Sequence, residues 1–329
     1  MEYRKLGRTE ITVSTVAMGC WAITGDWVWG KQDEQESIAT IRTALDVGIN
    51  FFDTAEAYGD GYSESLLGKA LAGIRHEAVI ASKVSPSNLS SDEVQNACER
   101  SLRRLNTDYI DLYQIHWPNW DIPISETMEA LEKLCQQGKV RAIGVSNFGV
   151  DDLSDLLGVG RCEANQLPYS LLGRAIEYEI SSRCIENDAG ILCYSPLAQG
   201  LLTGKFASID DVPETRARTR HFSKDRRLTR HDEDGCEAET FAAVENIRRI
   251  CAEIGAPMAE VALAWLLHRP GVTSVLAGAR NPNQIKQNVR AANLKLAPEI
   301  VNKLTQATDD LKQKLGPNPD LWESVSRYR

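Results

Sequence analysis

The amino-acid sequence predicts a single α/β domain, residues 1–329, of the (β/α)8 barrel class. An N-terminal β-hairpin is expected to cap the barrel, and extra helices are expected after its last strand. Short apolar stretches alternate with segments of helical periodicity about eight times, a pattern typical of parallel strands joined by helices. The composition shows no break that would mark a domain boundary. No G-x-G-x-x-G motif is present, so the doubly wound dinucleotide-binding fold lacks its characteristic loop.

The first expected elements are two short strands, Tyr3–Leu6 and Thr12–Val16, which flank a turn and form the hairpin. The eight expected barrel strands are apolar runs of about four to eight residues. They are Val16–Cys20, Asn50–Asp53, Ala78–Lys83, Tyr109–His116, Val140–Ser146, Glu163–Leu167, Ile191–Ser195 and Thr273–Ala277.

Helices are expected between these strands because apolar residues recur there at helical spacing. Ser90 with Glu93 predicts a capping box, and Gly48 and Gly138 are typical helix ends. The expected helices are Asp33–Gly48, Ser63–Leu71, Ser90–Leu105, Ser125–Gln137, Val150–Leu157, Arg174–Asn187, Thr240–Ile254, one from Pro257 that ends before Pro270, Pro282–Ala292 and Pro298–Leu315.

Two segments do not follow the alternation. Phe206–Gly235 is a long connection that carries six arginines among acids and turn residues, and Gly316–Arg329 is a C-terminal tail. A connection of this length inside a compact domain is usually functional or mobile. The long loop is therefore interpreted either as a solvated surface loop or as a basic loop that covers the phosphates of a cofactor.

The overall charge is acidic, with a net value of -9. A nucleic-acid partner requires a basic face, and docking on anionic lipid does too, so neither is expected. No apolar signal segment and no run of about 18 apolar residues occurs, which predicts a cytoplasmic protein without a membrane span. The eight cysteines form no C-x-x-C pair and the five histidines lack ligand spacing, so free structural thiols and no metal site are expected.

Polar residues stand where consecutive expected strands end. Asp53 ends the second strand, Lys83 the third and His116 the fourth, and Tyr58 lies just beyond Asp53. Each alone has an ordinary explanation, such as a helix cap, a surface lysine or a hydrogen-bonded core histidine. Together they are expected at the carboxyl-terminal mouth of the barrel, where barrel enzymes carry their active sites.

These four residue types fit the reduction of a carbonyl group. A phenol has a pKa of about 10, and a lysine ammonium beside it stabilises the phenolate. Asp53 is expected to hold Lys83 charged and oriented, and His116 to donate a hydrogen bond to the carbonyl oxygen. Tyr58 is then the general acid. The protein itself has no hydride, so a nicotinamide cofactor is required.

Several motifs in the same order resemble the aldo-keto reductase family, including bacterial and plant members with a GAR motif and potassium-channel β-subunits. They are FFDTAEAYG (Phe51–Gly59), SKV (Ser82–Val84), YIDLYQIHWP (Tyr109–Pro118), GKVRAIGVSNF (Gly138–Phe148) and YSPLAQGLLTGK (Tyr194–Lys205). The resemblance runs from near the start of the chain to about Ala297. It implies a (β/α)8 TIM barrel, NADPH dependence and the tetrad Asp53, Tyr58, Lys83 and His116.

The resemblance also implies the cofactor site, residue by residue. Ser146, Asn147 and Gln166 match residues that bind the nicotinamide carboxamide, and Tyr194 matches the aromatic residue that stacks on the nicotinamide ring. The loop that straps the pyrophosphate is matched by Ser195, Leu197, Gln199, Gly200 and Lys205.

The adenosine end is matched by Gly278–Asn288, in particular by Gly278, Arg280, Gln284 and Asn288. Better-known members carry Lys-Ser before the proline of this motif and an arginine after it. Arg280 is still suited to a 2′-phosphate, and Gln284 and Asn288 to the ribose phosphate and the adenine. The expected cofactor is therefore NADPH/NADP+, with NADH not excluded.

Tryptophans are concentrated in loops expected at the mouth: Trp21, Trp27, Trp29, Trp117 and Trp120. They are interpreted as the substrate pocket or, in part, as packing of the barrel top. The expected substrate is a small aldehyde or ketone, including sugar-derived ones. Two other functions stay open: a non-catalytic NADPH-binding redox-sensing or regulatory subunit, and a barrel hydrolase that uses Asp53 with a second carboxylate. The sequence identifies no protein partner.

Overall fold

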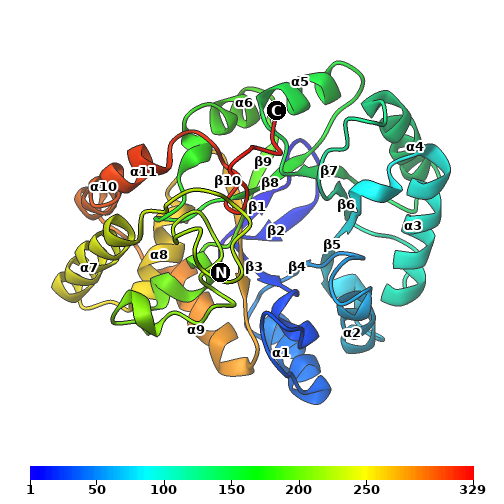
Figure 1. Cartoon of the computed structure of the whole chain (residues 1–329). Coiled ribbons are helices and arrows are strands. Elements are labelled where there is room, and N and C mark those ends of the chain that lie inside the picture. The colour runs from blue at the N-terminus through cyan, green and yellow to red at the C-terminus, as the bar shows by residue number, and fades with distance from the viewer.

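The computed structural model describes residues 1–329 and shows a closed barrel of eight parallel strands surrounded by helices (Figure 1). The strand order is β10-β3-β4-β5-β6-β7-β8-β9, which closes because β10 pairs with β3. The strands are β3 (Val16–Gly19), β4 (Phe51–Asp53), β5 (Val79–Val84), β6 (Leu112–Ile115), β7 (Ile143–Ser146), β8 (Ala164–Pro168), β9 (Gly190–Tyr194) and β10 (Val272–Gly278). The predicted fold class is confirmed.

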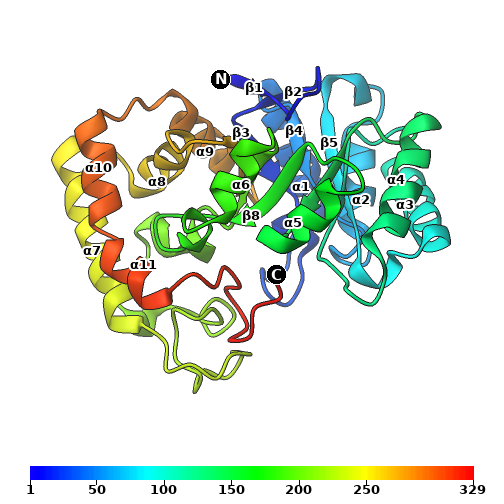
Figure 2. The same ribbon diagram turned by 90° about the horizontal axis from the view of Figure 1, so that it is seen from above.

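The predicted hairpin closes the amino-terminal end of the barrel. Strands β1 (Tyr3–Lys5) and β2 (Thr12–Ser14) pair antiparallel, and Tyr3 lies opposite Ser14. Leu6, Ile11 and Val13 are buried in one cluster with small and apolar side chains of the barrel interior, such as Ala81 and Ala164. Apolar packing therefore fills this end of the barrel interior. Figure 2 shows the hairpin at one end, and the long loop and the C-terminus at the other.

The outer ring consists of helices whose apolar faces pack against the strands. Its members are α1 (Glu34–Asp46), α2 (Tyr62–Ala70), α3 (Ser91–Leu105), α4 (Ile124–Gln136), α5 (Val150–Leu157), α6 (Ile180–Glu186), α8 (Met258–Leu267) and α9 (Pro282–Asn293). Helices α7 (Glu237–Ile254), α10 (Pro298–Gln306) and α11 (Asp309–Leu315) lie together outside this ring (Figure 1). All eight cysteines are free, and seven of them are buried.

Two helix predictions were wrong, and Arg174 explains both. The expected helix Pro298–Leu315 ends at Gln306 and restarts at Asp309. In a continuous helix the carbonyl of Thr305 would accept from the N–H of Asp309. Here it accepts from Arg174 Nη1 at 2.8 Å, and the same nitrogen donates to the Asp309 carboxylate.

Arg174 also binds the Glu177 carboxylate through its other nitrogens. Residues Ala175–Glu177 therefore form a short 3-10 turn, and α6 begins only at Ile180 rather than at Arg174. The capping box at Ser90 was wrong as well, because its side chain makes no capping bond. The carboxylate of Glu126, from α4, accepts from the N–H of Ser91 instead.

No single helix is long and apolar enough to cross a membrane. Helices α7 and α8 meet the length and composition criteria only when taken together, and they are bent by 95° at their junction.

Candidate active site

The predicted tetrad comes together at the carboxyl-terminal mouth of the barrel. Asp53 is the last residue of β4, Lys83 is the penultimate residue of β5, and His116 directly follows β6. Adjacent parallel strands place these ends side by side, and β4 pairs with β5 while β5 pairs with β6. The loop after β4 returns Tyr58 over them.

Lys83 lies at the centre of the tetrad and its side chain is fully buried. Its Nζ lies 2.8 Å from Asp53 Oδ2, 2.8 Å from the carbonyl oxygen of Thr54 and 3.2 Å from Tyr58 Oη. Burial acts to lower the pKa of Lys83, but Asp53 and Tyr58 outweigh it and hold that pKa above its ordinary value. The ammonium therefore stays charged directly beneath the phenol.

Tyr58 and His116 are both neutral groups in this environment. Burial raises the pKa of Tyr58, and the charge of Lys83 acts in the opposite direction. Burial, aided by Lys83, lowers the pKa of His116 to about 3. Their ring centroids lie 5.8 Å apart at an interplanar angle of 80°. The mouth thus presents a phenol that holds its proton and an imidazole that acts as a hydrogen-bonding group.

Asp53 connects the tetrad to the next residues of the site. Its Oδ1 accepts a 2.7 Å hydrogen bond from Gln166 Nε2, while its Oδ2 pairs with Lys83. Gln166 comes from β8, on the far side of the barrel from β4. Both oxygens of the carboxylate are therefore occupied, which fixes its orientation toward Lys83.

The side-chain amide of Asn147 joins several residues of the site by hydrogen bonds. It adopts a left-handed backbone conformation, with φ of 65°, in which Asn is favoured over most residues. Its Nδ2 donates to the carbonyl of His116 and to Ser146 Oγ. Its Oδ1 accepts from Tyr194 Oη at 2.9 Å and from Tyr328 Oη at 2.6 Å. The amide is thus fully hydrogen-bonded within the protein.

The C-terminal tail contributes to the mouth, which the sequence reasoning missed. Trp322 stacks with Tyr194 at a centroid distance of 6.2 Å. Arg327 lies over the ring of Trp117 at 3.9 Å and is paired with buried Asp320. The signal in the sequence was the concentration of aromatic and basic residues in a short tail, Trp322 to Arg329, that has no helical or strand periodicity.

One cavity of about 1050 Å³ joins these groups. It is lined by every predicted site residue except Lys83, which lies beneath Tyr58, and Trp120. The lining comprises Asp53, Tyr58, His116, Ser146, Asn147, Gln166, Tyr194, Ser195, Leu197, Gln199, Gly200, Lys205, Gly278, Arg280, Gln284, Asn288, Trp21, Trp27, Trp29 and Trp117. Trp120, in the loop after β6, does not line the cavity. It is more than half exposed and donates to Asp152 outside the cavity.

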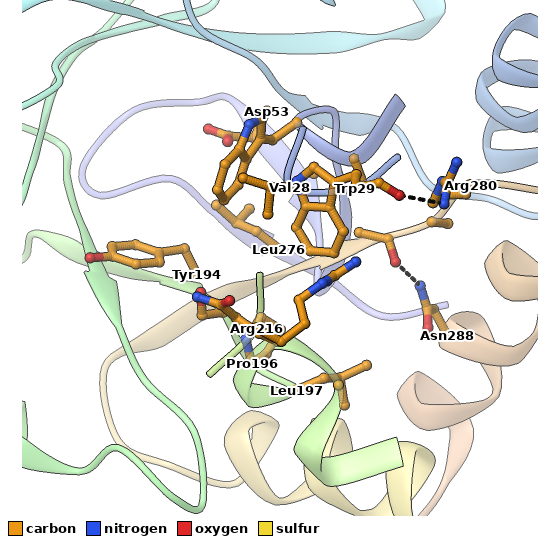
Figure 3. Close-up of a pocket in the computed structure, with 18 of the residues that line it drawn as sticks. Val28, Trp29, Asp53, Tyr194, Pro196, Leu197, Arg216, Leu276, Arg280 and Asn288 are labelled. Atoms are coloured by element: carbon orange, nitrogen blue, oxygen red, sulfur yellow. Dashed lines mark hydrogen bonds between the residues drawn. The ribbon is translucent and has the colours of Figure 1, made fainter. Parts of the chain in front are cut away.

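The aromatic wall begins at Tyr58 and leads away from it. Trp21 stacks with Tyr58 at 6.1 Å, and Trp29 meets Trp21 edge-on at 5.4 Å. The guanidinium of Arg216, from the long loop, lies 3.8 Å from the centroid of the Trp29 ring. Figure 3 shows Arg216 between Trp29 on one side and Pro196 and Leu197 on the other.

Arg280 is more constrained than its predicted role suggests. Its guanidinium donates to the carbonyl oxygens of Trp29, Gly30 and Lys31 and to Gln32 Oε1. It therefore ties the tryptophan-bearing loop to β10. Arg216 and Lys205, in contrast, make no ion pair, and burial lowers the pKa of each.

Comparison with known proteins identifies the same family as the motifs. The model of the Aldo/keto reductase family matches residues 15–309. The chain is 37% identical to the aldo-keto reductase YhdN of Bacillus subtilis, over 87% of each chain. It is 35% identical to the NADH-specific methylglyoxal reductase of Escherichia coli, over 94% of this chain and 98% of that protein.

Two more relatives bear on the alternatives. A probable voltage-gated potassium channel subunit beta of Oryza sativa is 29% identical over 92% of this chain and 95% of its own. The crystal structure of an aldo-keto reductase of Klebsiella pneumoniae in complex with NADPH superposes with a TM-score of 0.74. It is 29% identical and covers 99% of this chain and 100% of its own.

Proposed function

The chain belongs to the aldo/keto reductase family, and we propose that it reduces the carbonyl of a small aldehyde or ketone to an alcohol with NADPH, with Tyr58 as the general acid. The resemblance drawn from the motifs is thereby confirmed, as is the prediction of an aldo-keto reductase enzyme. One observation carries the mechanism. The hydroxyl of Tyr58 lies 3.2 Å from a buried lysine ammonium, in the wall of a cavity large enough for a dinucleotide.

The residues around the cavity fit a nicotinamide dinucleotide. The loop after β9 has positive φ angles at Ser195, Ala198 and Gln199, and both polar atoms of the Gln199 side chain are buried without a partner. Buried polar atoms without partners are costly unless a ligand satisfies them. Lys205 and Arg216 supply positive charge beside this loop. We assign this loop and Lys205 to the pyrophosphate.

The nicotinamide end is assigned to Tyr194, Ser146, Asn147 and Gln166. They surround the tetrad, and Gln166 contacts it directly through Asp53. The bound nicotinamide supplies the hydride. Asn147 must exchange at least one of its present partners before it can bind a carboxamide, since all its hydrogen-bonding positions are used.

The protein's own residues then handle the proton. Tyr58 keeps its proton until negative charge develops on the substrate oxygen, because burial raises its pKa. Lys83 stabilises the phenolate that remains, and Asp53 holds Lys83 in place. His116, being neutral, orients the carbonyl oxygen by hydrogen bonding rather than by proton transfer.

The adenosine end is assigned to Gly278, Arg280, Gln284 and Asn288. Because Arg280 already donates to four acceptors, Arg216 is the freer cation for a 2′-phosphate. The proposed cofactor is NADPH/NADP+, and NADH is the alternative. A relative that is named as NADH-specific shows that the family accommodates both. Trp21, Trp29 and Trp117 form the walls for the substrate, and Trp322 and Arg327 extend them.

The hydrolase and the regulatory subunit, the two other candidate functions, require different features of the site. A hydrolase requires a free carboxylate pair, but both oxygens of Asp53 are bound to Lys83 and Gln166. A regulatory NADPH-binding subunit remains a second candidate, since a potassium channel subunit beta is among the relatives. It differs from an enzyme in turnover and not in cofactor binding.

The experiment that tests the proposal combines binding with turnover. Tryptophan fluorescence is titrated with NADPH and NADH side by side, and NADPH oxidation is then followed with a panel of aldehydes and ketones. NADPH binding with turnover of a carbonyl compound supports the reductase. Tight NADPH binding with no turnover of any member of the panel would favour the regulatory subunit, and no binding of either nucleotide would refute both.

A further inference from the structure

Four cationic side chains that line the cavity have neither an ion pair nor a side-chain hydrogen bond: Lys205, Arg216, Arg218 and Arg230. They fall into two groups. Lys205 and Arg216 form the first group, which lies along Trp29 and Arg280. Burial and Arg280 lower the pKa of Arg216, and burial and Arg216 lower that of Lys205. This group is the one already assigned to the phosphates of the cofactor.

Arg218 and Arg230 form the second group. Arg218 is only 8% exposed, and its Nε is buried without a hydrogen-bond partner. Its guanidinium carbon lies 5.1 Å from the centroid of the Trp27 ring. Burial and then Arg230 lower its pKa, and Asp26 acts against them. The Asp26 carboxylate, however, already accepts from the indole of Trp21 and from the backbone of the following residues.

The second group lies beside the C-terminal tail. The backbone N–H of Arg220 donates to the carbonyl of Leu321, and its guanidinium donates to Asn318 and Leu315 carbonyls. Asp232 donates its N–H to Ser324 Oγ. The segments that carry Arg218 and Arg230 are thereby bound to the tail, whose Trp322 stacks with Tyr194.

Arg216 and Arg218 thus face different aromatic side chains. Arg216 covers Trp29, on the route to Arg280, whereas Arg218 covers Trp27. Trp27 is 62% exposed and belongs to the loop whose Trp21 stacks with Tyr58. The second group therefore lines the cavity between the Trp27 loop and the C-terminal tail.

A buried guanidinium without a partner is costly, and arginine binds carboxylate and phosphate groups through two parallel hydrogen bonds. We propose that Arg218 and Arg230 form a subsite for an anionic group of the substrate, so that the preferred carbonyl compounds carry a carboxylate or a phosphate remote from the reacting carbon. The exposed face of Trp27 packs against the chain that joins the two groups. This inference rests on the proposed reductase function and names the substrate class for it.

The test compares matched pairs of substrates at saturating NADPH. One pair is 4-carboxybenzaldehyde with its methyl ester, and the other is glyceraldehyde 3-phosphate with glyceraldehyde. The anionic member is expected to have a kcat/KM higher by about tenfold or more, the range for a charged hydrogen bond. The first pair reports on a carboxylate and the second on a phosphate.

Substitutions locate the effect. In Arg218→Gln the advantage of the anionic member is expected to disappear through KM, while NADPH affinity is retained. Arg218→Lys is expected to keep part of the advantage. The matched control is Arg226→Gln, in an arginine of the same loop that pairs with Glu214 and Glu237 outside the cavity. Both advantages should survive in this control.

The outcomes separate this inference from the function on which it rests. Reduction of the neutral aldehydes with no preference for either anionic partner would overturn the subsite and leave the reductase intact. Reduction of none of the four, with NADPH bound, would overturn both. If Arg218→Gln weakens NADPH binding as much as a substitution of Arg216 does, Arg218 belongs to the cofactor site and the inference is wrong.

Discussion

The floor and the rim of this site are built in different ways. The floor consists of Asp53, Lys83 and His116, each at the end of a barrel strand and held by backbone pairing with its neighbours. The rim consists of residues 206–235 and the tail, which are irregular and held by side chains such as Arg220. The floor places reacting groups to within a hydrogen bond, whereas the rim decides which ligand reaches them. Substitutions in the two regions should therefore affect different quantities.

The sharpest test of the floor is Tyr58→Phe, because the phenol of Tyr58 rests directly on Lys83. Removing the hydroxyl is expected to lower kcat by about 10²-fold or more, the usual contribution of a placed general acid. NADPH affinity should stay unchanged, because Lys83 and Asp53 remain paired beneath the ring. Steady-state kinetics and a fluorescence titration measure the two quantities. Near-normal turnover in this variant would remove Tyr58 from the mechanism.

A second test compares how His116 in the floor and His221 in the rim make the stability of the protein depend on pH. Burial and Lys83 lower the pKa of His116 in the floor to about 3, and burial lowers that of His221 in the rim to about 4. The unfolded chain binds these protons at about 6.5. Both residues therefore contribute stability that is fully present above pH 6.5 and is lost as the pH falls toward 4.

Two such groups are expected to lower the free energy of unfolding by about 3 kcal/mol per pH unit between about pH 6 and pH 4. Urea unfolding at pH 7.5, 6.5, 5.5 and 4.5 measures this slope. His116→Gln and His221→Gln should each remove about half of the histidine contribution. If only one of them changes the slope, the other histidine is protonated without unfolding, and its region opens on its own.

The floor could be predicted from the sequence because its signal is local. A short apolar strand that ends in Asp53, Lys83 or His116 shows both the strand and the polar residue at its mouth in a few consecutive letters. The parallel barrel then brings such ends together, whatever lies between them. Asp53 and Gln166 are 113 positions apart. Asp53 was identified from the strand that it ends, and Gln166 only from the resemblance to the family.

The rim could not be predicted, because its contacts join segments without any period. Arg220 binds carbonyl oxygens about 95 to 100 residues away in the sequence. No sequence pattern in either segment predicts these contacts. The two helices that were wrongly predicted near Arg174 have the same explanation. A long-range hydrogen bond from Arg174 to the carbonyl of Thr305 replaces a local helical one. Tyr328 and Trp322 were missed because a tail without periodicity gives no indication of where it folds.

Arg216→Ala tests the rim at the cofactor. Arg216 is half-buried without an ion pair and lies over Trp29. Loss of its charge is expected to weaken NADPH binding by about tenfold or more, as for other hydrogen bonds between charged groups. The kcat at saturating cofactor should change little, because the floor is intact. Arg226→Ala serves as the control from the same loop, since Arg226 pairs with Glu214 and Glu237. Equal effects of the two substitutions would mean that the loop acts only through its net charge.

The smallest expected effect lies where rim and floor meet. Tyr328 Oη donates to Asn147 Oδ1, which also accepts from Tyr194, so the oxygen that a nicotinamide carboxamide would use is already occupied. Tyr328→Phe removes one of these donors and keeps the buried ring against Trp117. NADPH binding is expected to become tighter by about threefold to tenfold, the range for a neutral hydrogen bond.

Stability should fall slightly in the same variant, by about 1 kcal/mol, because a buried hydrogen bond is lost. Tighter NADPH binding together with lower stability would show that the tail competes with the cofactor for Asn147. Weaker NADPH binding would show the opposite, that Tyr328 is part of the cofactor site. In that case the rim supports the floor rather than restricting access to it, and the two regions would have to be treated as one.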